Sequence, residues 1–149
     1  YPAGTFLLNP QGFRHAPFSK DGCMIFVKLC QFIGEGRDHV VIDTEHADWQ
    51  AAAPGVELLP LYRDDRYPED IALLRLAAGT PLPAAMVDAA AAPQGLEIFV
   101  VSGELQEDGR RHGAGAWLRE PRGVADGSGR RFTALADTTL YLKRNHLAA

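Results

Sequence analysis

An internal repeat constrains the fold of this chain more than any other feature of its sequence. Residues 4–15 contain a short apolar run, a Pro-x-Gly turn and a histidine, and residues 115–126 carry the same pattern. The two copies differ at one position of chemical interest, because His15 of the first copy corresponds to Asp126 of the second. A chain with such a repeat is most simply built from two related units.

The spacing of the repeat predicts two domains of unequal length. The offset between the copies is 111 residues at the histidine and 115 residues in the closing apolar runs, 24–29 and 139–143. One whole unit then occupies 38–149, whereas 1–37 match only the last third of such a unit. We therefore expect an incomplete first domain and a complete second one. We also expect about 75 residues of the first domain to precede Tyr1.

The composition is that of an ordinary globular domain, and it argues against nucleic-acid and membrane partners. Hydrophobic residues make up 46% and charged residues 23% of the 149 residues, as is usual for a folded protein. The net charge of −4 argues against a broad nucleic-acid-binding face, which needs an excess of cations to neutralise phosphates. No apolar run approaches the ~18 residues that a membrane span requires, so we expect no membrane partner.

The two cysteines indicate a reducing environment. Cys23 and Cys30 flank the run 24–29, and if this run is a strand, its ends lie roughly 23 Å apart. That separation is far beyond the reach of a disulfide. Neither cysteine belongs to a Cys-x-x-Cys pair, so no thiolate metal site is expected. We therefore expect both cysteines to be reduced and packed. Reduced cysteines are typical of a cytoplasmic protein, and we expect that location.

Short apolar runs separated by turn residues predict an all-β sandwich or barrel. The expected strands are 5–9, 24–29, 40–43, 57–62, 71–76, 96–101 and 139–143. Residues 44–53 are expected to form a turn or one short helix. The alanine-rich stretch 84–92 has a high helical propensity, but the prolines and glycines around it argue against a helix.

The spacing of residues in the first copy carries a family resemblance. Gly4, Pro10, Gly12 and His15 fit the pattern Gly-x5-Pro-x-Gly-x2-His, the second cupin motif, although its usual trailing asparagine is absent. With its flanking segments, the chain resembles the cupin domains of the ChrR-like family, which is named after anti-sigma factors. This resemblance implies a jelly-roll barrel (a double-stranded β-helix). The barrel would be complete in the second domain and represented only by C-terminal strands in the first.

Further segments extend the resemblance over nearly the whole chain. Residues 41–44, 58–61 and 74–80 look like the opening of a second cupin of this family, and 97–104 resembles its central strand. The ending Asn-His-Leu resembles the Gly-His-Leu ending of family members, which suggests a structural role for His146.

The resemblance also implies a metal site. Cupins of this family usually hold one divalent metal, often zinc, with two histidines and a glutamate from the first cupin motif and one histidine from the second. Imidazole and carboxylate ligands suit zinc, iron or manganese and leave open positions for a substrate. His15 is therefore the candidate metal ligand, with zinc or iron as the metal. Its three partner ligands are expected in the segment before Tyr1.

The same register predicts a second cupin without metal. Counting from the flanking glycines places Ala85 and Val87 approximately at the histidine positions, Leu96 at the glutamate position and Asp126 at the last one. Glu97 follows on the same strand, so its side chain should point to the opposite face. With one possible ligand among four, we expect a dry, apolar site that suits packing, dimerisation or a hydrophobic small molecule.

The remaining polar residues give weaker signals. His39, His46 and His112 are expected in loops or at strand ends, on the surface. The acidic loop 64–70 lacks the alternating oxygen ligands of a calcium loop, and we expect a solvated hairpin there.

Three functions remain open. The first is a ChrR-like sensor or regulatory protein that binds a small molecule or a metal and forms a homodimer. The second is a metal-dependent dioxygenase with iron or zinc in the first cupin, because relatives of this class include diketone-cleaving enzymes. The third is a purely structural interaction protein. ChrR-type anti-sigma factors bind their sigma factor through a helical zinc domain. No part of this sequence resembles that domain, so sigma-factor inhibition is not carried over, and fold alone does not decide among the three.

Overall fold

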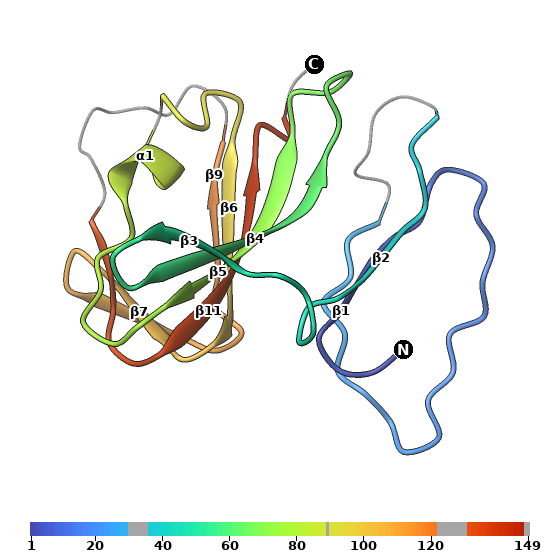
Figure 1. Cartoon of the computed structure of the whole chain (residues 1–149), viewed down its shortest axis with the longest axis horizontal. Coiled ribbons are helices and arrows are strands. Elements are labelled where there is room, and N and C mark those ends of the chain that lie inside the picture. The colour runs from blue at the N-terminus through green and yellow to red at the C-terminus, as the bar shows by residue number, and fades with distance from the viewer. Residues whose placement is uncertain (30–35, 89, 122–130, 148–149) are drawn as a thin grey trace. The chain divides into compact units, whose positions relative to one another are not determined.

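A computed structural model describes residues 1–29, 36–88, 90–121 and 131–147 (Figure 1). In these residues the fold is all-β, with one helical turn, α1 (Ala84–Val87). The strands are β1 (Thr5–Leu8), β2 (Val40–Asp43), β3 (Gln50–Ala53), β4 (Val56–Arg63), β5 (Asp70–Leu76), β6 (Leu96–Ser102), β7 (Glu104–Glu107), β8 (Arg110–Gly113), β9 (Trp117–Glu120), β10 (Phe132–Ala134) and β11 (Thr138–Arg144). None of the described helical segments is long and apolar enough to cross a membrane.

The chain divides into two compact units. We call Tyr1–Glu45 the N-terminal unit and His46–Ala149 the barrel unit. The division predicted from the sequence, 1–37 and 38–149, follows the repeat. The compact units are defined by contacts in space, so they do not test it and it stays a prediction.

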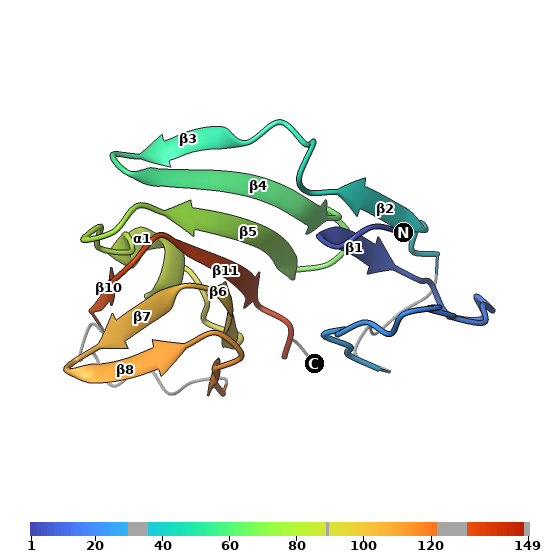
Figure 2. The same ribbon diagram turned by 90° about the horizontal axis from the view of Figure 1, so that it is seen from below.

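The barrel unit consists of two antiparallel sheets. The larger sheet has the strand order β3-β4-β5-β11-β6-β9, and the smaller has the order β10-β7-β8. Figure 2 shows α1 and the smaller sheet on one side of the larger sheet. The closing strand β11 lies between β5 and β6, so the end of the chain completes the middle of the larger sheet.

An apolar core fills the space between the two sheets. Strand alternation supplies it, because every second side chain of β5, β6 and β11 points to the same face. The members of this core are Val56, Leu74, Leu76, Leu82, Val87, Ala92, Leu96, Ile98, Val100, Leu105, Phe132, Ala134, Leu140 and Leu142. Burying each large side chain among them is worth about 1.5–3 kcal/mol, so this cluster is the main source of stability of the barrel unit.

The N-terminal unit has a two-stranded antiparallel sheet, in which Thr5 lies opposite Asp43 and Leu8 opposite Val40. Its opening turn repeats that of β9. The N–H of Thr5 donates to the carbonyl of the residue three positions earlier at 3.3 Å, and the N–H of Ala116 does the same at 3.0 Å. Gly4 and Gly115, which precede these residues, have φ angles of 78° and 87°. The repeat seen in the sequence is thus visible in the backbone.

Three predicted elements are wrong. Residues 24–29 form no strand, because in the described part of the N-terminal unit β1 and β2 pair only with each other and a strand needs neighbours. Within 44–53, residues 44 and 45 form the predicted turn, but Gln50–Ala53 forms β3, since pairing with β4 outweighs the low strand propensity of alanine. Within 84–92, Ala84–Val87 forms one helical turn, which Pro83 opens with a φ of −58°.

The other predicted strands are confirmed. Residues 40–43, 57–62, 71–76, 96–101 and 139–143 all lie within strands of the structure. Residues 5–9 match β1 except for the last residue.

Candidate functional site

The motif of the first copy folds as a strand, a turn and an exposed histidine. The N–H of Phe13 donates to the carbonyl of Pro10 at 3.0 Å, and Gly12 has a φ of 81°, so the predicted turn is present. His15 lies on the surface, with its ring edge-on to Phe13 at 5.7 Å. Phe13 also stacks on the ring of His39 at 4.5 Å. One phenyl ring therefore contacts both imidazoles.

The residues around His15 do not by themselves fit a metal ion. Within the described ranges, no group of three His, Cys, Asp or Glu side chains is arranged to hold one. A zinc ion in a protein takes three or four protein ligands, and a single exposed imidazole supplies one. We therefore derive no step of chemistry through a metal here, and His15 as a ligand stays a prediction.

The positions that correspond to metal ligands in the second cupin are mostly apolar and only partly brought together. Val87 and Leu96 are buried and belong to the same core cluster. Ala85 is exposed on α1, because two residues along a helix lie on different faces, whereas two residues along a strand share one. Asp126 lies in 122–130, outside the described residues. Hydrocarbon side chains at Val87 and Leu96 cannot bind a metal.

Glu97 points away from this core, as predicted from strand alternation. Its side chain is 1% exposed, and its Oε1 accepts a hydrogen bond from Nε of Arg119 at 3.0 Å. Nε2 of His146 lies 3.3 Å from the same oxygen. The tail of the chain is fixed here by its backbone as well, because the N–H of Asn145 donates to the carbonyl of Gly95 at 2.8 Å. The geometry gives His146 a structural role.

A fully buried ion pair lies on the same face of the larger sheet. Nζ of Lys143 is 3.6 Å from Oε2 of Glu69, and the two side chains are 0% and 5% exposed. Tyr141 is also buried beside them. Burial, and after it the negative charge of Glu69, raises the pKa of the Tyr141 phenol well above its usual value of 10. These groups form a polar layer behind the hydrophobic core.

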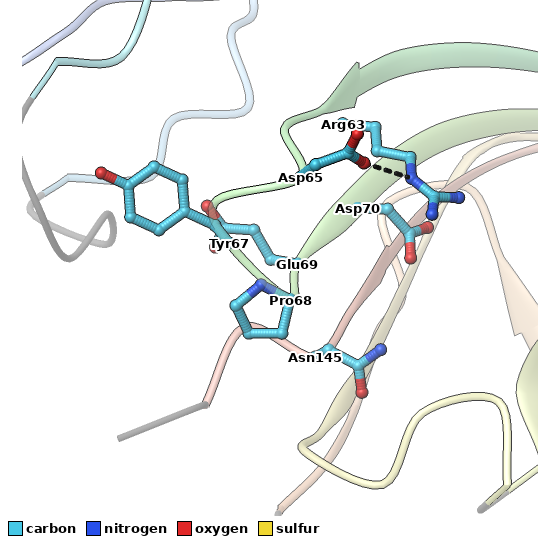
Figure 3. A pocket seen from close by; sticks show the side chains of 7 residues that line it. All are labelled: Arg63, Asp65, Tyr67, Pro68, Glu69, Asp70 and Asn145. Atoms are coloured by element: carbon cyan, nitrogen blue, oxygen red, sulfur yellow. Dashed lines mark ion pairs between the residues drawn. The ribbon is translucent and has the colours of Figure 1, made fainter.

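A polar hollow of about 250 Å³ opens at the end of this layer (Figure 3). Its lining residues are Arg63, Asp65, Tyr67, Pro68, Glu69, Asp70 and Asn145. Arginines already engage two of the carboxylates: Nε of Arg63 lies 3.7 Å from Asp65, as the dashed line shows, and Nη2 of Arg144 lies 2.7 Å from Asp70. The acidic loop was visible in the sequence, but no signal placed Asn145 beside it.

The rest of the acidic loop is a turn held by its own ion pair. Nη2 of Arg66 lies 2.6 Å from Oδ2 of Asp64. Hydrogen bonds from the Arg66 side chain and backbone hold the pKa of Asp64 well below its usual range. The predicted hairpin is confirmed as a turn between β4 and β5, but it is not solvated throughout, because Glu69 is buried.

The other predicted surface residues are confirmed with one exception. His39 and His46 are exposed. The expected packing of the cysteines is wrong for Cys23, which is an exposed free thiol. Cys30 lies outside the described residues. His112 is half-buried in β8, with Nε2 3.1 Å from Oε2 of Glu107, because β8 pairs with β7 in this part of the chain.

Comparisons with solved structures show a cupin fold. An acetylacetone dioxygenase from Acinetobacter johnsonii is 14% identical, with a TM-score of 0.55 over 79% of this chain and 80% of that one. A putative acetylacetone dioxygenase from Methylibium petroleiphilum is 15% identical, with a TM-score of 0.53 over 81% of each chain. At these identities the likeness concerns the fold alone.

A chain from the Rhodobacter sphaeroides complex of SigE with the anti-sigma ChrR is also similar. It is 16% identical, with a TM-score of 0.51 over 67% of this chain, and this chain spans about half (49%) of its length. A comparison with the curated proteins gives no match. The model of the ChrR cupin-like domain family matches residues 37–147. Because this match covers most of the sequence, the chain belongs to the ChrR cupin-like family.

Proposed function

We propose that this chain belongs to a sensor or regulatory protein whose second cupin is a metal-free structural module. The observation that carries the proposal is the placement of Val87 and Leu96. The register counted from the flanking glycines assigns both to ligand positions of the first cupin motif, and both pack in the hydrophobic core. Packed hydrocarbon side chains at these positions stabilise the barrel. They cannot bind a metal ion, so they provide no metal-dependent chemistry.

The metal or small-molecule site of the protein would then lie in the first cupin. We propose that His15 contributes one ligand to a zinc or iron site there, with the other ligands supplied by residues outside the described part of this chain. The exposure of His15 supports this, because an imidazole on the surface is accessible to ligands from another segment. A cytoplasmic location fits the free thiol of Cys23.

The partners that fit this role are a small-molecule ligand, a second copy of the chain in a homodimer, or another protein. One similar structure is of an anti-sigma factor with its sigma factor, which supports a protein partner in general and not that one in particular. A net charge of −4 gives no support to a nucleic-acid partner.

A metal-dependent dioxygenase is the competing function, and it depends on the same histidine. It requires a complete first-cupin site with zinc or iron, of which the described residues provide His15. A metal sensor and a dioxygenase both require a metal in the first cupin. Metal binding by the first cupin is therefore the first test of both functions.

The experiment is metal analysis of the full-length protein that contains this chain, since the described residues supply only His15; the protein is incubated with zinc or iron and unbound ions are removed. The proteins compared are the unmodified chain, H15A and the control H46A, which removes another exposed histidine. We expect no more than one ion per chain, lost in H15A and kept in H46A. Equal metal content in H15A and the unmodified chain would refute His15 as a ligand. Absence of metal from all three would refute the metal-sensor and dioxygenase functions together.

A further inference from the structure

Strand β2 belongs to the second cupin by sequence but to the N-terminal unit by its contacts. The ChrR cupin-like family model covers residues 37–147, and this range includes β2. The compact barrel unit begins only at His46, whereas β2 pairs with β1 in the N-terminal unit (Figure 1). The opening strand of the second cupin therefore pairs with a strand of the preceding one.

The backbone shows which edge of β1 holds β2. The carbonyl of Gly4 accepts from the N–H of Thr44 at 3.2 Å, so it points toward β2. Peptide groups along an extended strand point alternately to its two edges. The N–H groups of Phe6 and Leu8 therefore also point toward β2.

The corresponding edge of β9 is open in the described residues. The repeat makes Trp117 of β9 the counterpart of Phe6. The carbonyl of Ala116 accepts from the N–H of Val100 in β6 at 2.9 Å, so by the same alternation the N–H of Trp117 points away from β6. Among the described strands, β9 ends the larger sheet with β6 as its neighbour. Its other edge is the one through which β1 holds β2.

A side chain on β9 would be covered by a strand at this edge. Trp117 is 48% exposed, although the guanidinium group of Arg119 lies 5.1 Å from the centre of its ring. Its counterpart Phe6 is half-buried and lies directly opposite Ile42 of β2. Side chains opposite each other in an antiparallel pair contact on the same face. A strand added to β9 would place a side chain against Trp117 in the same way.

We propose that β9 accepts the opening strand of the preceding cupin of the same polypeptide, antiparallel to β9, as β1 accepts β2. The repeat places that strand, the counterpart of β2, in the segment expected before Tyr1. The two cupins would then exchange their opening strands reciprocally. The inference rests on the two-cupin organisation and not on the metal site, so its test is separate from that of the proposed function.

The pairing of β1 with β2 specifies the chemistry of the added strand. Ile42 lies opposite Phe6, and Val41 lies opposite Leu7. The added strand therefore carries apolar residues opposite Trp117 and Leu118, and β-branched residues suit such a pleated surface. A strand of this length makes few contacts, but its connection to the same polypeptide makes the pairing intramolecular and raises its effective concentration.

Hydrogen exchange followed by NMR in the full-length protein that contains this chain provides the test. The N–H groups of Trp117 and Arg119 should exchange as slowly as those of Phe6 and Leu8. In the chain that begins at Tyr1, exchange at the two β9 positions should be roughly a hundredfold faster or more. Exchange at the two β1 positions should remain slow there, because β2 is still present.

Two controls keep the test independent of folding and of surface polarity. The N–H of Leu118 points toward β6, where Ile98 lies opposite it, and its slow exchange in both proteins reports that β9 is folded. W117D in the full-length protein should speed exchange at Arg119 roughly tenfold, because the added strand loses an apolar contact. L135D changes another exposed apolar residue of the barrel unit and should leave that exchange unchanged.

Four results would overturn the proposal. One is fast exchange at Trp117 and Arg119 in the full-length protein while Phe6 and Leu8 exchange slowly. Another is slow exchange at the β9 positions that persists in the chain beginning at Tyr1, because residues of that chain would then cover the edge. The third is slow exchange in that chain that disappears on dilution, which would make a second copy the occupant. The fourth is equal exchange at Arg119 in W117D and the unmodified protein.

Discussion

Replacing Leu96 by glutamate places a carboxylate at the position that the predicted register assigns to the glutamate of the first cupin motif. Leu96 is buried in the core with Val87. The loss of its apolar burial costs about 1.5–3 kcal/mol. A buried carboxyl group is also more stable in its protonated, neutral form. At pH 7, protonating it lowers the free energy of unfolding by about 1.4 kcal/mol for each pH unit above the unfolded pKa of about 4.3, or roughly 4 kcal/mol in all.

The sum, about 5–7 kcal/mol, is comparable with the whole stability of an ordinary domain. The pKa of the new glutamate is raised in the folded state, so the stability associated with its protonation is present below pH 4.3 and lost as the pH rises. The deficit of L96E should therefore shrink by about 2.7 kcal/mol between pH 7 and pH 5. Urea unfolding followed by tryptophan fluorescence measures both values, and L96M, which keeps the volume, should lose less than about 1.5 kcal/mol.

Zinc distinguishes a packed core from a dormant metal site. A site that binds only the folded state would stabilise it by about 2.7 kcal/mol when zinc is present at 100 times its dissociation constant. We expect no zinc-dependent shift in the unfolding of L96E, because Val87 beside it offers no ligand. A rise in the urea midpoint with zinc, absent from L96M, would refute the reasoning.

Three further predictions concern the polar layer and one turn. R119A should lose about 3 kcal/mol of unfolding free energy in urea because it leaves the carboxylate of Glu97, which is 1% exposed, without its arginine partner. E97A should lose less, because Arg119 is half-exposed and water hydrates its charge; equal losses would contradict this. Tyr141 has a raised pKa, so its contribution is present below pH 10 and lost above it; Y141F should flatten the decline in thermal stability above pH 10, and an unchanged decline would count against it. Gly103 has a φ of 80°, and a Cβ added there would collide with backbone atoms. Gly109 has a φ of 88°, but a Cβ added there would meet no other atom. G103A should therefore lower the melting temperature more than G109A, and the reverse order would contradict this reasoning.

Several strands could be predicted from the sequence because their side chains meet a packed face of the sheet. Strands β4 and β5 are rich in leucine and end at turn residues, and both lie within one residue of the predicted bounds. Strand β3 could not be predicted, since Gln50–Ala53 has little strand propensity and owes its structure to pairing with β4. The opposite error concerns 24–29, which has the right pattern but lacks paired strands in the described residues. Propensity and pattern are local properties, and strand pairing is not.

In the candidate site too, features that depend on local sequence could be predicted, and features that depend on contacts between distant segments could not. The orientation of Glu97 follows from alternation along a strand, which needs no knowledge of the rest of the molecule. The exposure of Ala85 contradicts its assignment beside Val87, because α1 replaces the strand on which both residues would share a face. The hollow beside Glu69 depends on Asn145, which is distant in sequence and brought near by the pairing of β11 with β5.

Crystals of the protein grown with zinc and measured at the zinc absorption edge test the central claim most directly. We predict no anomalous peak in the interior of the barrel unit, where Val87 and Leu96 pack against the core. An ordered zinc ion among those side chains would contradict the proposal that the second cupin is a metal-free module.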